Sequence, residues 1–167
     1  MGKTSALVIV NQSMELGSYI TGFVDGEGSF LVSFSKRERM NIGIEVRPSF
    51  TVSQNKRNDN VLSILKNYFG CGSTRFNSSD QTFKYEVRSL KELLAQIIPH
   101  FIRYPLMSSK SKDFQKFFDI CQLIKRKEHL THDGICEIIE IAHEMNNFGA
   151  RRYAKEQLLR AVDKMKV

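Results

Sequence analysis

The sequence predicts an α+β fold in which a four-stranded antiparallel sheet carries helices on one face. Segments with alternating apolar and polar residues are interleaved with amphipathic helical segments in the order α-β-β-α-β-β-α, and further helices follow. Each strand segment has one polar and one apolar side, which is typical of an antiparallel sheet covered on one face only. A length of 167 residues, 41% of them hydrophobic, fits one domain over residues 1–167 with a substantial core.

The first predicted element is a helix over about residues 14–26. Small residues recur in it at three- and four-residue spacing, namely Gly17, Ser18, Thr21 and Gly22. Small side chains leave little to hold two backbones apart, so another helix can approach such a strip closely.

The next two elements are predicted strands over residues 29–37 and 42–54. Phe30, Val32 and Phe34 alternate with polar residues in the first, and the second continues the same period of two. Pro48 inside the second strand indicates an edge position or a bulge, because proline has no N–H to donate to a ladder. Residues 58–69 then form a predicted amphipathic helix that ends at Gly70.

Two further strands are predicted over residues 73–79 and 82–88, joined by a polar turn. A short helix over residues 90–98 should end at Pro99, and His100 just after it is expected at the surface or at the edge of the core. Helices over residues 109–126, 133–146 and 152–164 complete the chain, so its C-terminal part is helical over about residues 109–164.

The charge favours a polyanionic partner, with nucleic acid the foremost candidate. Lys and Arg number 25 against 18 Asp and Glu, which gives a net charge of +7. Residues 29–90 hold an excess of five bases, whereas residues 1–28 hold an excess of two acids. The longest apolar run near the N-terminus, residues 6–10, is too short to span a bilayer, so no membrane partner is expected.

The polar face of the predicted sheet is a candidate DNA-binding surface. Its side chains can reach base edges or phosphates, and a β-ribbon fits the major groove of DNA. The alternative is an ordinary solvated sheet face. The candidates are Ser29, Ser33, Ser35, Arg37, Glu45, Arg47, Ser49, Thr51, Arg75, Asn77, Lys84, Glu86 and Arg88.

The stretch YITGFVDGEGS at residues 19–29 is the candidate for chemistry. It places Asp25 and Glu27 at a helix end, where the carbonyl end of the helix dipole disfavours carboxylates unless a cation binds. A hard divalent cation such as Mg²⁺ suits these oxygen ligands. A calcium loop would need glycine in place of Phe30 and an acid in place of Lys36. A plain polar turn is the other alternative.

The segment ITGFVDGEG at residues 20–28 resembles the LAGLIDADG motif of homing endonucleases and their maturase relatives. YPLMSSKSKDF at residues 104–114 and the segment at 127–149 are similar to further parts of that family. The resemblance implies the αββαββα LAGLIDADG fold. It also implies a metal-dependent DNA endonuclease that hydrolyses phosphodiester bonds at a specific site in double-stranded DNA.

The resemblance also implies roles for single residues. Glu27 would bind the metal, with the carbonyl of Gly26 as a second ligand. Gln54 would line the water network of the active site. Lys110 would lie near the scissile phosphate with Lys112 in reserve, although some members carry this lysine where the present chain has Ser108. The implied cofactor is Mg²⁺, for which Ca²⁺ or Mn²⁺ can substitute.

One motif in the sequence implies a homodimer, because family members place two motif helices side by side. The expected interface residues are Ser18, Thr21, Gly22 and Asp25, and a two-fold dimer favours a pseudo-palindromic site. The resemblance further suggests an intron-encoded protein of a mitochondrion or chloroplast. Two alternatives stay open on the same fold: an RNA maturase that binds intron RNA, and a non-catalytic DNA-binding protein.

Overall fold

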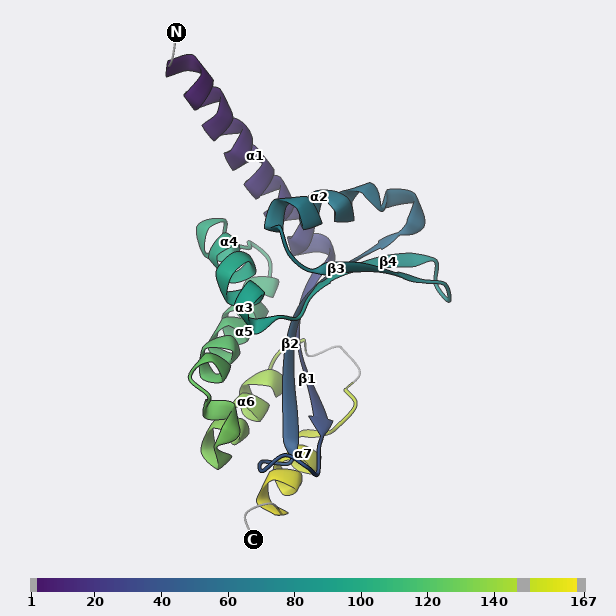
Figure 1. Cartoon of the computed structure of the whole chain (residues 1–167), viewed down its shortest axis with the longest axis vertical. Coiled ribbons are helices and arrows are strands. Elements are labelled where there is room, and N and C mark those ends of the chain that lie inside the picture. Colours follow the sequence, from purple (N-terminus) through teal and green to yellow (C-terminus); the bar gives the residue numbers. More distant parts are fainter. Residues whose placement is uncertain (1–2, 147–150, 165–167) are drawn as a thin grey trace.

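The computed structural model describes residues 3–146 and 151–164, with side chains from Glu15 onward, and it confirms the predicted fold class. Figure 1 shows the long first helix entering a sheet that is flanked by the other helices. The strands are β1 (Gly28–Lys36), β2 (Ile44–Asn55), β3 (Ser73–Asn77) and β4 (Thr82–Val87). The helices are α1 (Lys3–Glu27), α2 (Asn60–Phe69), α3 (Leu90–Glu92), α4 (Ile98–Arg103), α5 (Lys110–Lys125), α6 (His132–His143) and α7 (Lys155–Asp163).

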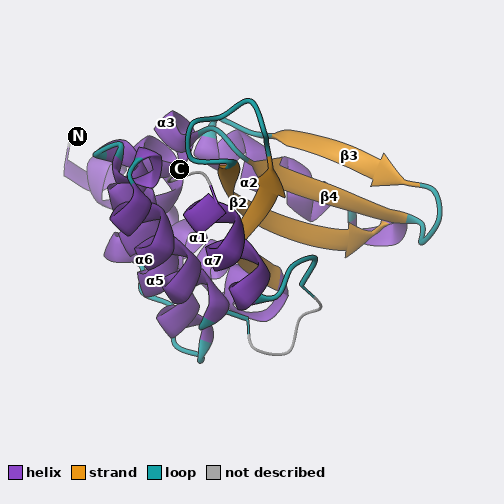
Figure 2. Ribbon diagram, turned by 90° about the horizontal axis from the view of Figure 1, so that it is seen from below, coloured by secondary structure: helices purple, strands orange, loops and turns teal. Residues whose placement is uncertain are grey.

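The strands form one antiparallel sheet in the order β1-β2-β4-β3. The helices gather on one side of it, as Figure 2 shows. Phe30 lies at the centre of the core between sheet and helices, with the rings of Phe50, Phe101, Phe114 and Phe117 all 5.2–5.4 Å from its own. The apolar face of the sheet therefore packs against the apolar faces of the helices, as the alternating strand pattern predicts.

Strand β2 changes its neighbours along its length. It pairs with β1 from Ile44 to Val52, but it pairs with β4 only from Phe50 to Asn55. Pro48 lies opposite Val32 of β1, at a level that β4 does not reach. The edge position that this proline indicated is thereby confirmed.

The helix predicted to end at Pro99 continues to Arg103. A π-helical turn, η2 (Leu93–Ile97), joins α3 to α4 and resets the hydrogen-bond ladder, so that Pro99 falls in the first turn of α4. A proline there has no N–H bond to lose. The prediction was wrong because a π turn leaves no clear mark in the sequence. The extra turn is what brings His100 and Tyr104 against α1.

The first helix is also longer than predicted, since α1 begins at Lys3 rather than near residue 14. Among the described residues, no helix combines the length and the apolar character that crossing a bilayer requires.

Candidate functional site

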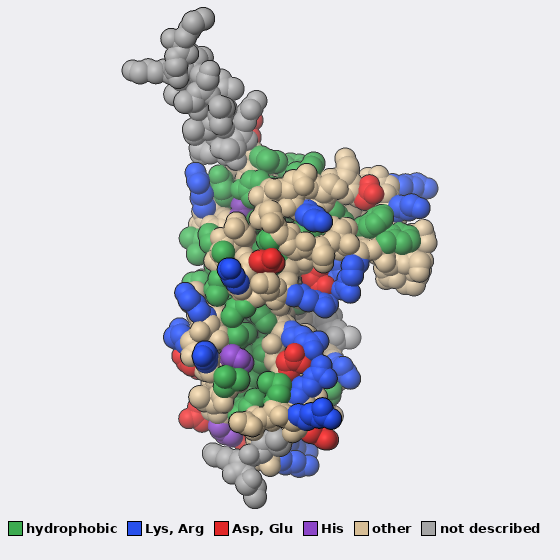
Figure 3. Space-filling view, in the orientation of Figure 1, with side chains coloured by type: hydrophobic (Ala, Val, Ile, Leu, Met, Phe, Trp, Pro, Cys, Tyr) green, Lys and Arg blue, Asp and Glu red, His purple; other side chains and the backbone are tan. Residues whose placement is uncertain are grey.

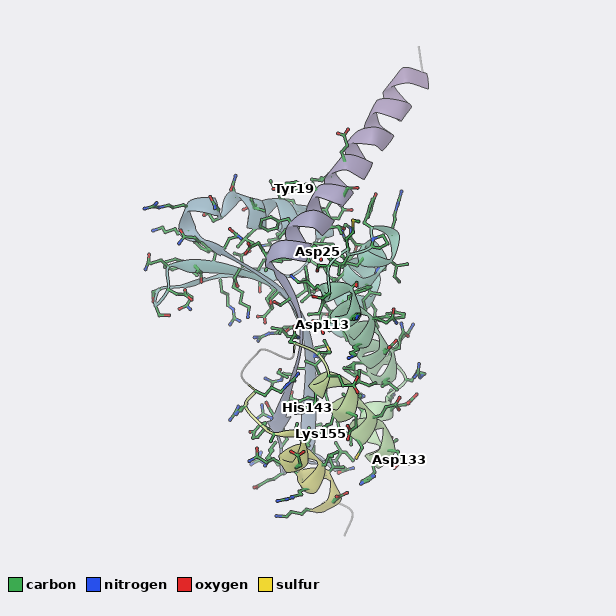
Figure 4. All side chains as sticks on the ribbon, turned by 180° about the vertical axis from the view of Figure 1, so that it is seen from behind. Tyr19, Asp25, Asp113, Asp133, His143 and Lys155 are labelled. Carbon is green, nitrogen blue, oxygen red and sulfur yellow. The ribbon has the colours of Figure 1, made fainter. Side chains whose placement is uncertain are left out.

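The candidate site lies where α1 runs directly into β1. Ile20 and Val24 on the inner side of the helix are fully buried and fix it against the core. A Cβ at Gly28 would lie 2.5 Å from a side-chain carbon of Val24, so only glycine permits this abrupt change from helix to strand. The junction holds Asp25 and Glu27 at the end of α1; Figure 4 labels Asp25 there.

Asp25 is bonded within its own chain. Its carboxylate accepts hydrogen bonds from the backbone N–H groups of Met107 and Ser108, both at 3.0 Å, and from the Ser108 hydroxyl. Burial alone would raise the pKa of Asp25, but these hydrogen bonds and the nearby Lys110 ammonium bring it below its usual value. The carboxylate therefore ties the end of α1 to the segment before α5. Its predicted place at a dimer interface stays a prediction.

Glu27, by contrast, is exposed, and its carboxylate makes no hydrogen bond or ion pair with any residue that the structure describes. Gly26 beside it is exposed too, with open space where a side chain would project. The last carbonyls of a helix lack intrahelical partners. Carboxylate and carbonyl oxygens are the ligands that Mg²⁺ prefers, so the residues present fit such an ion.

One chain offers only part of a metal site at this junction. Within the described ranges, no three His, Cys, Asp or Glu residues gather closely enough to hold a metal ion. Asp25 is already occupied by its own hydrogen bonds. Any cation bound by Glu27 must therefore draw further ligands from outside the described chain, such as water, a phosphate or a second protein copy.

The structure brings Lys110 close to the two acids, although it lies 86 residues from its hydrogen-bond partner Val24 in the sequence. Its ammonium donates a hydrogen bond to the carbonyl of Val24 at 2.9 Å, near the end of α1. Burial lowers the pKa of Lys110, and the carboxylates of Asp25, Glu27 and Asp113 act in the opposite direction. Lys112 is exposed. The geometry thus favours Lys110 over Lys112, and Ser108 is engaged with Asp25 instead.

Gln54 lies beside the same junction. Val52 pairs with Gly28, the first residue of β1, so Gln54 two residues further along β2 reaches past the start of β1 towards the end of α1. Its side chain is half-buried. Lys110 therefore comes from a separate segment to the end of α1 that holds Gly26 and Glu27, and the register places Gln54 on the adjoining part of β2.

The strip of small residues on α1 divides between two sides of the helix. Ser18 and Gly22 are exposed, and nothing lies within 4 Å of the position a Gly22 side chain would take. Gly17 and Thr21 face inward. A Cβ at Gly17 would lie 2.5 Å from the Tyr104 ring, and the Thr21 hydroxyl donates to the Tyr104 carbonyl at 3.1 Å. Thr21 is 7% exposed, so its predicted place at a dimer interface is wrong.

Sequence reasoning missed the buried histidine behind α1. His100 is enclosed by the core, with its Nε2 3.0 Å from the Thr21 hydroxyl and its Nδ1 3.1 Å from the Tyr68 hydroxyl. Burial lowers the pKa of His100 to about 4, so the ring is neutral at pH 7. The helical spacing of the buried residues Leu93, Ile97 and Phe101 indicates a helix that continues through His100. The expected end of the helix at Pro99 led to the prediction that His100 lies at the surface or at the edge of the core.

The register of the sheet places the predicted polar residues on one face. Ser29 pairs with Thr51, Ser33 with Arg47 and Ser35 with Glu45, while Thr51 pairs with Glu86 and Arg75 with Lys84. Figure 3 shows Lys and Arg side chains gathered along these strands, with acids set among them. We call this surface the open face.

Three members of the open face are not available for direct contact. Ser49, Thr51 and Glu86 are buried, although each was predicted to face DNA. Ser49 and Thr51 are short side chains on a central strand, opposite the longer Leu31 and Glu86. Glu86 is covered by the bases that it binds. The alternating pattern of the strands predicted correctly which face of the sheet these three residues occupy, but it did not predict that they are buried.

Two carboxylates organise the bases of the open face. Glu45 accepts from Arg37 and Arg47, each at 2.8 Å, and the hydrogen bonds from Arg47 and Arg37 lower its pKa. Glu86 lies 2.8 Å from Arg75, 3.0 Å from Arg88 and 3.9 Å from Lys84. These two groups are called the Glu45 cluster and the Glu86 cluster.

Comparison with known proteins identifies the family that this chain resembles. The model of a family described as LAGLIDADG endonuclease matches residues 20–121. The homing endonuclease I-ApeII of Aeropyrum pernix is 27% identical over 154 residues, covering 88% of this chain and 90% of the relative. A probable intron-encoded endonuclease of Neurospora crassa is 34% identical over 140 residues, or 83% of this chain. The chain spans only 31% of the length of that relative.

Solved structures give the same result. The crystal structure of the homing endonuclease I-TnaI has 37% identity and a TM-score of 0.78, over 89% of this chain and 97% of that one. The archaeal intron-encoded homing endonuclease I-Vdi141I, complexed with DNA, has 28% identity and a TM-score of 0.84, over 93% and 98%. The LAGLIDADG homing endonuclease I-LtrWI, bound to its target DNA, has 36% identity and a TM-score of 0.81, over 85% and 48%.

Proposed function

Since the chain belongs to the LAGLIDADG endonuclease family, we propose that it is a site-specific endonuclease that hydrolyses double-stranded DNA with a divalent cation, Mg²⁺ foremost. The observation that carries the proposal is the unengaged carboxylate of Glu27, held near the Lys110 ammonium at the end of α1. The open face supplies a basic surface for the duplex.

Each residue of the junction has a part in this proposal. Glu27 and the Gly26 carbonyl would hold the cation, which when bound supplies Lewis-acid stabilisation and an activated water. Lys110 brings positive charge towards the scissile phosphate. Gln54 offers an amide that can orient water. Asp25 holds the segment before α5 in place, so that Lys110 reaches the end of α1.

A homodimer is part of the proposal, because one copy offers a single free carboxylate at the junction. A two-fold partner adds a second Glu27, and Ser18, Gly22 and Gly26 form an exposed strip of small residues on which a helix can pack closely. The chain matches nearly all of I-TnaI and I-Vdi141I but about half of I-LtrWI. Relatives thus occur both at this length and at about twice this length. A two-fold dimer favours a pseudo-palindromic target.

An organellar gene is the proposed setting, with the mitochondrion preferred over the chloroplast. Relatives of this chain are named for the ND4 intron of Podospora anserina and a cox1 intron of Schizosaccharomyces pombe. The maturase and the non-catalytic DNA-binding protein are less favoured alternatives. Neither explains why Glu27 stays unengaged near the half-buried Lys110.

The test is cleavage of a randomised duplex library in Mg²⁺ by the wild type and by Glu27→Gln. The substitution should lower the cleavage rate about 1000-fold or more, since metal assistance contributes several kcal/mol to the transition state. DNA binding in EDTA should persist, because Glu27 is not on the open face. Glu137→Gln, which removes the same charge from an exposed site on α6, is the matched control and should cut normally. Cleavage by Glu27→Gln at the wild-type rate would refute the assignment.

A further inference from the structure

The two clusters of the open face differ in how deeply their acid is buried. The Glu86 side chain is 6% exposed, whereas Arg75 and Arg88 around it are 61% and 59% exposed. In the Glu45 cluster the acid itself is 31% exposed. The Glu86 carboxylate thus lies beneath basic side chains that reach into solvent.

The contacts of Glu86 converge on one end of its side chain. A single oxygen, Oε2, accepts from Nη2 of Arg75 and lies 3.0 Å from Nη2 of Arg88. The other oxygen, Oε1, faces the Lys84 ammonium at 3.9 Å. Arg75 comes from β3, Lys84 from β4, and Arg88 from the residue after β4. One buried group therefore fixes cations from different places in the sheet.

This arrangement leaves each arginine capable of reading DNA. A guanidinium has five N–H donors in a rigid plane, and the contact with Glu86 uses one nitrogen. The remaining donors are free for a guanine edge or a phosphate. A long surface side chain normally loses rotamer freedom when it is immobilised at an interface, which weakens binding. An arginine already held by a buried acid has less freedom to lose.

The acid also discourages contacts that are not specific. Non-specific DNA binding depends on how many phosphates the Lys and Arg side chains neutralise. A carboxylate among these side chains therefore weakens non-specific binding. The bases do not need Glu86 for solvation, because they are well exposed to water. Burying a carboxylate is costly without such partners. Its place under Arg75 and Arg88 is therefore better explained by what it does to the arginines.

We propose that Glu86 is a positioning residue for DNA sequence recognition, which orients Arg75 and Arg88 so that they discriminate between base pairs. Glu86 itself touches no DNA. The inference rests on the proposed function, since it requires a protein that binds duplex DNA selectively.

The experiment measures specificity separately from affinity and stability. The wild-type protein first selects a duplex from a randomised library in EDTA, where metal-dependent cleavage is suppressed. The dissociation constants for that duplex and for a scrambled duplex then give a specificity ratio for each variant. Glu86→Gln should lower the ratio about tenfold, which corresponds to about 1.4 kcal/mol, because one oriented base contact is lost. Part of the fall should come from tighter binding of the scrambled duplex.

Matched variants identify the cause. Glu137→Gln makes the same charge change at an exposed site on α6, away from the sheet, and should keep the wild-type ratio. A similar fall in Glu137→Gln would attribute the effect to net charge and overturn the proposal. Glu86→Asp keeps the charge but shortens the reach by one methylene. The specificity ratio of Glu86→Asp should also fall. This variant replaces Glu86→Gln in the test if thermal melting shows that Glu86→Gln does not fold.

The remaining outcomes are distinguishable. A lower melting temperature with an unchanged ratio in both Glu86 variants would mark a purely structural residue and overturn the positioning role. A wild-type ratio near one would show no selective binding at all. That result would refute the proposed function itself, and the positioning role with it.

Discussion

Asp25 and Glu27 lie two residues apart in the same motif, and the structure surrounds them in opposite ways. Asp25 accepts three hydrogen bonds from Met107 and Ser108, whereas Glu27 faces solvent with its carboxylate unengaged by the described residues. The same contrast runs along α1. Gly17, Thr21 and Asp25 contact other segments of the same chain, and Gly22 and Glu27 point away from them. The motif therefore has an inner side that holds the fold and an outer side left for partners.

The largest stability effect is expected on the inner side, at His100. Its pKa in the folded state, about 4, is below the ordinary value of 6.5, so the unfolded state binds more protons between these values. The contribution is complete above pH 6.5 and is lost as the pH falls towards 4, by on the order of 3 kcal/mol. Urea unfolding of the wild type and His100→Gln across this range measures it. An equally steep decline in His100→Gln would contradict the inner-side role of this ring.

The two acids provide the second comparison. Asp25→Asn should lower the free energy of unfolding by about 2 kcal/mol, since hydrogen bonds to a charged group contribute about 1.5–3 kcal/mol. Because the pKa of Asp25 is lowered, its stabilisation is present above the ordinary value of 3.8 and disappears as the pH falls through the folded-state pKa. Glu27→Gln, measured by the same chemical denaturation at pH 7, should change the stability by less than about 0.5 kcal/mol. Equal losses of unfolding free energy in the two variants would contradict the division of the motif into an inner side that holds the fold and an outer side left for partners.

The smallest effect is expected from the two glycines. Gly17→Ala drives a methyl group into the Tyr104 ring, so overpacking should outweigh the gain in helix propensity and destabilise the protein by about 1 kcal/mol. Gly22→Ala meets open space, and its helix propensity should stabilise one chain by up to about 1 kcal/mol. Thermal melting without DNA, at a protein concentration where the chains are monomeric, should therefore shift in opposite directions. Sedimentation of Gly22→Ala should also show a weaker dimer. Shifts of the same sign would contradict the two-sided reading of α1.

Much of this molecule could be predicted from its sequence. The strands were visible because alternation has a strict period, and the junction was visible because Asp25, Glu27 and the glycines stand in a short motif. The side that Thr21 faces was not visible, because small residues carry no hydrophobic period that separates inside from outside. The helix through Pro99 depends on a π turn, and the burial of Glu86 depends on bases that fold over it from elsewhere in the sheet. Such features arise from tertiary contacts.

The exchange of neighbours along β2 has a consequence for how this surface can evolve. The β1–β2 and β2–β4 ladders share only the stretch from Phe50 to Val52. The first ladder holds Glu45, and the second holds Glu86, whose arginines come from β3 and from the residue after β4. A substitution at Arg47 can alter one ladder while the register of the other stays fixed. Under the proposed function, recognition on this face is divisible into two blocks, which selection or an engineer can change one at a time.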